Sequence, residues 1–337
     1  MLGGAGRLGE PNQANLRIQS VVSTGSRPVG VAVNSDTHRV YVSNEGDDSV
    51  TVLDGTTGTQ IATVALGQRP GAVAVDRERN LIFVANRDSD TISVIDGSTD
   101  TATNEFSTGA VPGGELVGAL AVDEPCGHVW VGDCGDRASV FKSGLCAATL
   151  RVLDETSGET IDSQFTGGLP GTPGIYLDNI LGIAISSNDG SAYVLHADKY
   201  GSTTVDVVDL TSLAPTARVI VPNGGLALAI DSDVHQTYIG GRGYLIVVDQ
   251  ATKLTSVYTG HTPFKLAVDP AAKRIYVTDS SPTNTVAVVD EASFSVLQSV
   301  TVAAAPKGVA VDESSHLVYV ANRDNDSLTI LAMMSSM

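Results

Sequence analysis

IFVANRDSDTISVI, at residues 82–95, returns almost unchanged as VYVANRDNDSLTIL at residues 318–331. Each copy joins two short strands of alternating residues through a loop rich in Asn, Asp and Ser, which is typical of β-structure. A duplicated binding site and a repeated structural unit would both produce such a pair. The number of copies distinguishes the two explanations.

The chain contains seven copies of this unit, most of them about 40 residues apart. A strand of small residues opens each copy: GVAV (30–33), AVAV (72–75), ALAV (119–122), GIAI (182–185), ALAI (227–230), KLAV (265–268) and GVAV (308–311). A second strand follows: VYVSN (40–44), IFVAN (82–86), VWVGD (129–133), AYVLH (192–196), TYIGG (237–241), IYVTD (275–279) and VYVAN (318–322). A third strand, such as VTVLD (50–54), closes the unit, and units of this kind predict a β-propeller.

The two ends of the chain are expected to meet. Most units continue into a fourth strand such as QIATVAL (60–66), but the seventh unit has too little chain left for one. LRIQSVVST (16–24) belongs to no unit, so we expect it to pair with LTILA (328–332) and close the ring.

We therefore predict an all-β protein consisting of a single seven-bladed β-propeller over residues 15–334, preceded by an N-terminal arm of residues 1–14. Three insertions interrupt the repeat, at 133–150, 168–179 and 196–204. The acidic pairs Asp88/Asp90 and Asp324/Asp326 are interpreted as turn formers that bond their own backbone.

The segments VYVSN, IYVTD and VYVAN, each followed by a strand of the xVxVxD type, resemble the YVTN family of β-propeller repeats. More distantly they resemble lactonase-type seven-bladed propellers. The resemblance covers about residues 16–334 and implies the propeller fold. It leaves function open, because this fold hosts binding proteins, scaffolds and several classes of enzyme.

Composition narrows the choice of partners. The net charge is −18, which argues against nucleic acid or an anionic membrane as a partner. No run of 18 apolar residues is present, so we expect no membrane span. The first residues lack the apolar segment of a signal peptide, which leaves a cytoplasmic location and a removed leader both open.

Basic residues concentrate on one predicted face. Loops between blades and loops between the second and third strands must share a face, called here the top face. Half of the 20 Lys and Arg residues fall in these loops: Arg27, Arg69, Arg87, Arg137, Lys142, Lys199, Arg242, Lys265, Lys307 and Arg323. The sequence therefore predicts a relatively positive top face that attracts anions, although Arg residues beside Asp in NRDSD and NRDND could instead stiffen the turns.

Lys265 departs from the repeat. The other six units carry a small residue at its position: Gly30, Ala72, Ala119, Gly182, Ala227 and Gly308. A lysine on a crowded inner strand must extend toward the mouth of the channel to keep its ammonium group solvated. There it could hold a carboxylate, act chemically if its pKa were lowered, or pair with a neighbouring acid.

Two histidines provide candidates for catalysis. His38, His128, His235 and His316 are expected on the opposite, bottom face, whereas His196 and His261 are expected on top. His196 lies close in sequence to Lys199 and Tyr200, a set that could perform acid–base chemistry, although loop histidines are often plain surface residues. The candidate catalytic residues are His196, His261, Lys265 and Tyr200. The candidate ligand-binding residues are Arg27, Arg69, Arg87, Glu115, Asp178, Lys199, Arg242, Lys307 and Arg323.

The resemblance to lactonases implies a calcium ion in the tunnel, held by side-chain oxygens. The residues that could supply them are Glu115, Asp178, Asn179 and Asn223. Their positions do not coincide in the repeat and match no family motif residue by residue. We therefore predict no metal and no cofactor, with calcium kept as an alternative.

The cysteines bear on the cellular compartment. Cys126 and Cys134 flank one strand and are about 25 Å apart, beyond the reach of a disulfide, so we expect Cys126 to be free. Cys134 and Cys146 share an insertion and could form a bridge or stay reduced. Such a bridge would favour a secreted or cell-envelope location over a cytoplasmic one.

Three functions are consistent with these features. The first is binding of a small anionic or polar ligand, or of a partner's loop, in the top-face funnel. The second is a hydrolase or lyase acting there on a lactone-like substrate, and the third is a cell-surface interaction module. Whether the chain is an enzyme is left open, and we expect a monomer.

Overall fold

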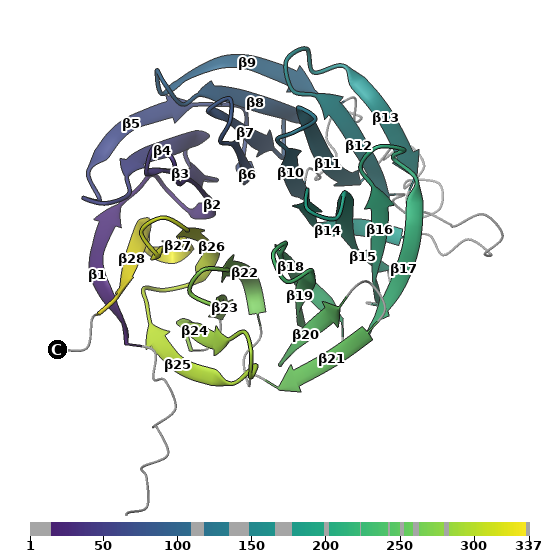
Figure 1. Cartoon of the computed structure of the whole chain (residues 1–337). Helices are drawn as coiled ribbons and strands as arrows, with labels where there is room; N and C mark the ends of the chain where they lie inside the picture. Colours follow the sequence, from purple (N-terminus) through teal and green to yellow (C-terminus); the bar gives the residue numbers. More distant parts are fainter. Residues whose placement is uncertain are drawn as a thin grey trace, which may run out of the picture.

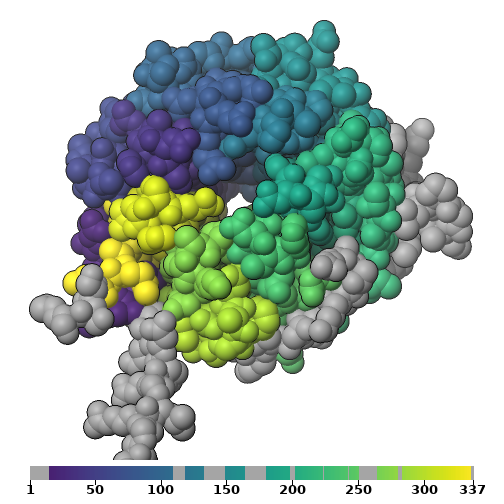
Figure 2. Space-filling view, viewed as in Figure 1, coloured from purple at the N-terminus to yellow at the C-terminus, as the bar shows by residue number. Residues whose placement is uncertain are grey.

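The computed structural model describes residues 15–108, 118–134, 148–165, 177–198, 202–222, 224–241, 243–249, 253–258, 263–279 and 283–334. Seven four-stranded antiparallel sheets stand as blades around a central channel (Figure 1). This confirms the predicted seven-bladed propeller. An opening is visible at the centre of the ring in the space-filling view (Figure 2).

Within a blade the chain runs from the innermost strand, beside the channel, to the outermost. Blades one to three contain β2 (Pro28–Asn34), β3 (Arg39–Asn44), β4 (Ser49–Asp54) and β5 (Gln60–Ala65); β6 (Pro70–Asp76), β7 (Leu81–Asn86), β8 (Thr91–Asp96) and β9 (Thr101–Ser107); and β10 (Ala119–Asp123), β11 (His128–Cys134), β12 (Ala148–Asp154) and β13 (Thr160–Phe165). Blades four to six contain β14 (Leu177–Ser186), β15 (Ser191–Asp198), β16 (Thr203–Asp209) and β17 (Pro215–Val221); β18 (Gly225–Asp231), β19 (Gln236–Gly241), β20 (Tyr244–Asp249) and β21 (Lys253–Tyr258); and β22 (Pro263–Asp269), β23 (Arg274–Asp279), β24 (Thr285–Asp290) and β25 (Val296–Thr301). Blade seven contains β26 (Pro306–Asp312), β27 (Leu317–Asn322), β28 (Ser327–Met333) and, as its outermost strand, β1 (Leu16–Ser23).

The ring closes as predicted, because the first strand of the chain completes the last blade. β1 pairs antiparallel with β28, from Leu16 opposite Met333 to Ser23 opposite Ser327. Leu16 is 1% exposed and packs in the core of blades six and seven. Its N–H and C=O also bond the Gln298 side chain at 2.9 and 2.8 Å, which ties β1 to blade six as well.

The second strand of each blade carries the core. Both of its faces are covered by neighbouring blades, so it reads as a nearly continuous apolar run with one buried aromatic residue in every copy. These aromatics are Tyr41, Phe83, Trp130, Tyr193, Tyr238, Tyr276 and Tyr319. A Cβ at Gly55 would lie only 2.6 Å from the Tyr319 hydroxyl, which explains why a glycine follows Asp54 in that turn.

Bottom-face turns follow one design. The turn between the first two strands of each blade ends on a residue with positive φ: His38, Asn80, Gly127, Gly190, His235, Lys273 and His316. The histidines predicted for this face lie in these turns or directly after one. The turns between the third and fourth strands begin with an aspartate. Hydrogen bonds from Thr56 and Thr57 to Asp54 hold the pKa of that carboxyl at about 2.

On the top face, our interpretation of the acidic turns is wrong for Asp326. Asp326 accepts a hydrogen bond not from its own loop but from the Arg27 N–H of the next blade, at 2.7 Å. Asp48 accepts the Arg69 N–H in the same way at 2.8 Å. Asp326 and Asp48, the last residues of their top-face loops, therefore fasten neighbouring blades together.

The insertions are shorter than expected, because strands extend into them. β14 and β15 occupy Leu177–Ser186 and Ser191–Asp198, and β11 and β12 reach Cys134 and Ala148. The middles of all three insertions lie outside the described residues. No helix in the described part of the chain is long and apolar enough to cross a membrane.

Ring closure can be tested at one side chain. Leu16→Ala should lower the free energy of unfolding by about 2–4 kcal/mol, because it leaves a cavity in the core that joins blades six and seven. Denaturant titration followed by circular dichroism measures the change.

Ile18→Ala, on the same strand but 45% exposed, is the matched control and should cost less than about 1 kcal/mol. Equal and small losses for the two variants would show that β1 is not part of the folded core.

Candidate functional site

The upper part of the central channel is a narrow cavity of about 140 Å³. Among the described residues it is lined by Gly, Ala, Val, Leu and Ile from the inner strands of the blades, and Lys265 is the one charged residue of that described lining. A low-polarity wall around a single ammonium group strengthens any electrostatic contact made there.

Lys265 occupies the position that the repeat predicts. Its N–H donates to the Thr278 hydroxyl at 3.1 Å, as the Gly30 N–H donates to the Ser43 hydroxyl at 2.9 Å in blade one. The side chain lies inside the channel, half-buried. Loss of solvation, and to a smaller extent repulsion from Arg87, holds the pKa of Lys265 below its ordinary value.

Two further cations lie near the channel mouth. Arg87 comes from the top loop of blade two, and its stem passes over Gly71, where a Cβ would meet Arg87 Cδ at 3.0 Å. Lys307 is the second residue of β26 and places its Nζ 3.8 Å from the centroid of the Phe264 ring. Partial burial lowers the pKa of Lys307, although Asp324 and Glu45 act in the opposite direction. Among the residues that the structure describes, none of these three cations forms an ion pair with an acid.

Three of the predicted arginines are engaged elsewhere. Arg27, Arg69 and Arg323 surround the buried carboxylate of Glu45, with N···O distances of 3.6, 2.8 and 3.5 Å. Arg69 also contacts Asp88. Arg323 also contacts Asp324 at 3.6 Å. The arginines come from three consecutive blades, so this cluster fastens blades seven, one and two, and its three cations are balanced by Glu45, Asp88 and Asp324.

His196 lies in a structural environment. It is fully buried at the end of β15, and its Nε2 lies 3.2 Å from Oδ2 of Asp206, which also binds Arg218. Hydrogen bonds from Arg218 and His196 keep the pKa of Asp206 low despite its burial. A side chain without access to solvent or to the channel cavity fits a structural role better than the predicted catalytic one.

The remaining predicted residues cannot be placed. His261, Tyr200, Glu115, Lys199, Arg242 and Asn223 lie outside the described residues, as do Arg137, Lys142 and Cys146. Asp178 and Asn179 lie on β14, but their side chains are outside the described part of the chain. Cys126 is free and exposed, as expected.

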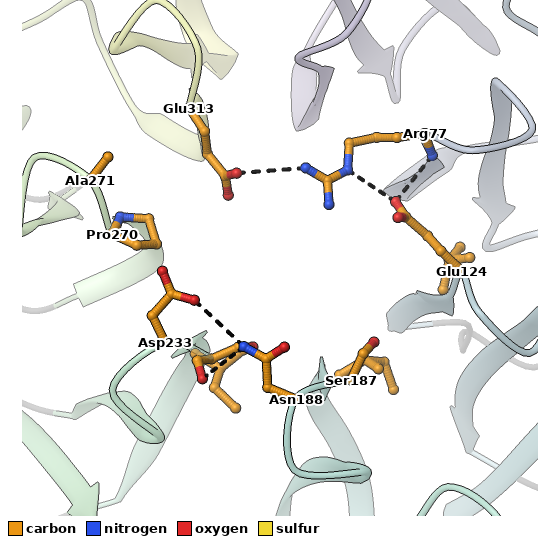
Figure 3. A pocket seen from close by; sticks show the side chains of 12 residues that line it. Arg77, Glu124, Ser187, Asn188, Asp233, Pro270, Ala271 and Glu313 are labelled. Atoms are coloured by element: carbon orange, nitrogen blue, oxygen red, sulfur yellow. Dashed lines mark hydrogen bonds and ion pairs between the residues drawn. The ribbon is translucent and has the colours of Figure 1, made fainter.

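Sequence reasoning missed a larger cavity at the bottom mouth of the channel, about 450 Å³ in volume (Figure 3). Arg77 lies between two carboxylates there, with its Nε 3.1 Å from Glu124 and its Nη1 3.6 Å from Glu313. Asn188 and Asp233 line the opposite side, where the Asn188 amide donates to the Ser232 carbonyl. Burial raises the pKa of Glu313. With three acids and one base, this cavity does not favour anions.

The residue that directly follows the first strand of each blade varies between the repeats, and this variation could have indicated the cavity. Arg77, Glu124 and Glu313 all occupy that position, and the prediction concentrated on the other face.

Comparison with known proteins supports the fold. A family model described as "Lactonase, 7-bladed beta-propeller" matches residues 5–118, about a third of the chain. Hydrazine synthase from Kuenenia stuttgartiensis is similar in structure, with a TM-score of 0.78 and 15% sequence identity over 93% of this chain and 97% of that one. No curated protein matches the chain. At this identity the structural likeness establishes the propeller alone.

The arginine cluster generates a prediction. Glu45→Ala should lower stability by about 1–3 kcal/mol, because three neighbouring guanidinium groups then lack their shared carboxylate while staying partly solvated. Millimolar phosphate should restore part of the lost melting temperature by taking the place of the carboxylate.

Asp47→Ala removes an acid of the same loop that accepts the Ser26 N–H and pairs with no arginine of the described chain, and it should show no rescue by phosphate. Rescue of both variants to the same extent would mean that phosphate stabilises the protein in general.

Proposed function

We propose that the top mouth of the channel recognises an anionic group, a carboxylate or a phosphate, on a small molecule or on a partner's loop. The observation that carries the proposal is Lys265, an ammonium group placed in the channel wall where six sister blades have Gly or Ala.

The free-energy cost of placing the Lys265 ammonium group in the channel wall supports the presence of a ligand there. Burying an ammonium group beside Arg87 without a counter-charge disfavours the folded state, and its lowered pKa expresses that cost. Sister blades fold with a residue that avoids it. An anion that binds between Lys265, Arg87 and Lys307 would compensate for the lost solvation with charge-assisted hydrogen bonds.

The size of the cavity limits what enters. At about 140 Å³ it accommodates a carboxylate or phosphate group but not a complete drug-sized molecule, which needs about 300 Å³ or more. We therefore infer that the anionic end of the ligand inserts into the channel, while its remaining part lies over the top-face loops near Arg69 and Arg323.

A lactonase-like hydrolase is the second candidate, favoured by the family model that matches residues 5–118. Lys265 and Arg87 would then hold the charge that develops on the opening ring, and His261 stays the predicted acid or base. Acid release from a panel of lactones, measured with wild-type protein and Lys265→Met, distinguishes an enzyme from a binding protein. We also propose that the seven repeats of this chain are of the YVTN type.

Removing the ammonium group should weaken binding. With citrate as probe, we expect Lys265→Met and Lys265→Ala to lose about 1–3 kcal/mol of binding free energy by calorimetry, the value of a charge-assisted hydrogen bond. Wild-type affinity should fall as pH rises through the lowered pKa of Lys265, because only the protonated form attracts the anion. Added salt should also reduce it.

Lys273→Met, in a bottom-face turn, is the charge-matched control and should bind citrate as the wild type does. Unchanged affinity in Lys265→Met would remove this residue from the site. Loss of binding in Arg77→Gln alone would move the site to the bottom cavity.

A further inference from the structure

The bottom-face turns offer seven copies of one environment. The last residue of each inner strand points a polar side chain into the protein, and each is at most 1% exposed: Asn34, Asp76, Asp123, Ser186, Asp231, Asp269 and Asp312. A buried carboxylate needs hydrogen-bond donors or a cation to be tolerated.

Blades six and seven provide such donors in the same way. Asp269 accepts the Ala272 N–H of its own turn and contacts His316 Nδ1 of the next blade at 2.8 Å. Asp312 accepts the Ser314 N–H and contacts His38 Nδ1 of the next blade at 2.9 Å. In both pairs the histidine is the positive-φ residue that ends the turn of the following blade.

Asp123 breaks this pattern. Neither of its carboxylate oxygens accepts a hydrogen bond from a nitrogen or hydroxyl donor of the described residues, although the side chain is 1% exposed. The carboxylate interacts instead with the Cys126 thiol of the same turn. The residue of the next blade that should reach it is Gly190, which has no side chain and only open space around its Cβ position. The histidine that contacts Asp269 and Asp312 is therefore missing here.

Two metal-binding side chains stand where that donor is missing. Asp123, Cys126 and His128 each offer one possible ligand atom, and these three atoms all lie within 4.8 Å of one another. Cys126 is free and exposed, so its sulfur can be reached from solvent. The Nδ1 atom of His128 is buried and has no hydrogen-bond partner among the described residues. In the other blades these two turn positions carry no Cys–His pair.

We propose that Asp123, Cys126 and His128 bind a thiophilic divalent metal ion of the zinc class, with a fourth position open to water. Thiolate and imidazole favour zinc or cobalt over calcium and magnesium, which prefer sets of oxygen ligands. In a tetrahedral zinc site ligand atoms lie about 3.3–3.6 Å apart, so small side-chain rotations complete the site. All three ligands belong to one tight turn of the DxxCxH type, which keeps them preorganised.

Cobalt provides a direct test on the full chain with any affinity tag removed. Titration with Co²⁺ should give a thiolate-to-cobalt charge-transfer band and the visible bands of tetrahedral cobalt, saturating at one equivalent, and Zn²⁺ should displace both. Cys126→Ser should abolish the charge-transfer band, and His128→Gln should weaken binding by roughly 100-fold or more.

Gly190→His is a variant that keeps all three ligands. Blades one, five and seven already have a histidine with positive φ at the equivalent position. Folding of the variant should therefore be retained. The new imidazole should bond Asp123 as His316 bonds Asp269, and cobalt affinity should fall while the melting temperature is maintained or rises.

Two outcomes would overturn the proposal. One is a charge-transfer band that persists in Cys126→Ser or disappears in the double variant Cys134→Ser/Cys146→Ser, which leaves the trio intact. The other is the absence of stoichiometric cobalt binding in the wild-type protein. His235→Gln, another bottom-face histidine, should leave the titration unchanged.

Discussion

The close approach of neighbouring inner strands is the constraint on which the rest of the molecule depends. The Ser43 hydroxyl bonds the Gly30 N–H of its own blade and the Gly71 carbonyl of the next, and Thr278 joins Lys265 to Lys307 in the same way. A Cβ on Gly30 would collide with the Gly71 carbonyl oxygen. Small residues are therefore required along most of the channel, and pairing of β1 with β28 holds the ring that keeps these strands together.

Because the blades are so regular, positions at which one blade differs from the others are the ones that indicate function. Lys265 adds a charge to a wall that packing elsewhere restricts to small residues, and Gly190 removes the donor that a buried aspartate needs. In the described part of the chain, Lys265 forms no ion pair with an acid, and the Asp123 carboxylate accepts no hydrogen bond from a nitrogen or hydroxyl donor. We interpret each as a place where a ligand completes the structure, an anion at the top mouth and a metal ion in the blade-three turn.

The sequence predicted features that depend on one blade at a time. Strand order, closure by residues 16–24 and the place of Lys265 all follow from the repeat, because each copy specifies its own strands and turns. Features that arise between blades were missed or misread. Asp326 bonds Arg27 across the closure, Glu45 contacts arginines from three blades, and the bottom cavity is formed by residues such as Arg77 and Glu313 from non-adjacent blades. Such contacts depend on how neighbouring blades are rotated and staggered, which no pattern within one copy specifies.

The most direct measurement of the central claim, an anion site built around Lys265, is labelling with pyridoxal 5′-phosphate followed by borohydride reduction and peptide mapping. The reagent carries a phosphate for the channel mouth and an aldehyde that condenses with an unprotonated amine, with loss of water, and a lowered pKa makes that form of Lys265 more abundant. The account predicts that Lys265 is modified first among the six lysines and that citrate or phosphate protects it. Modification spread evenly over Lys253, Lys273 and Lys265, or no protection by either anion, would contradict it.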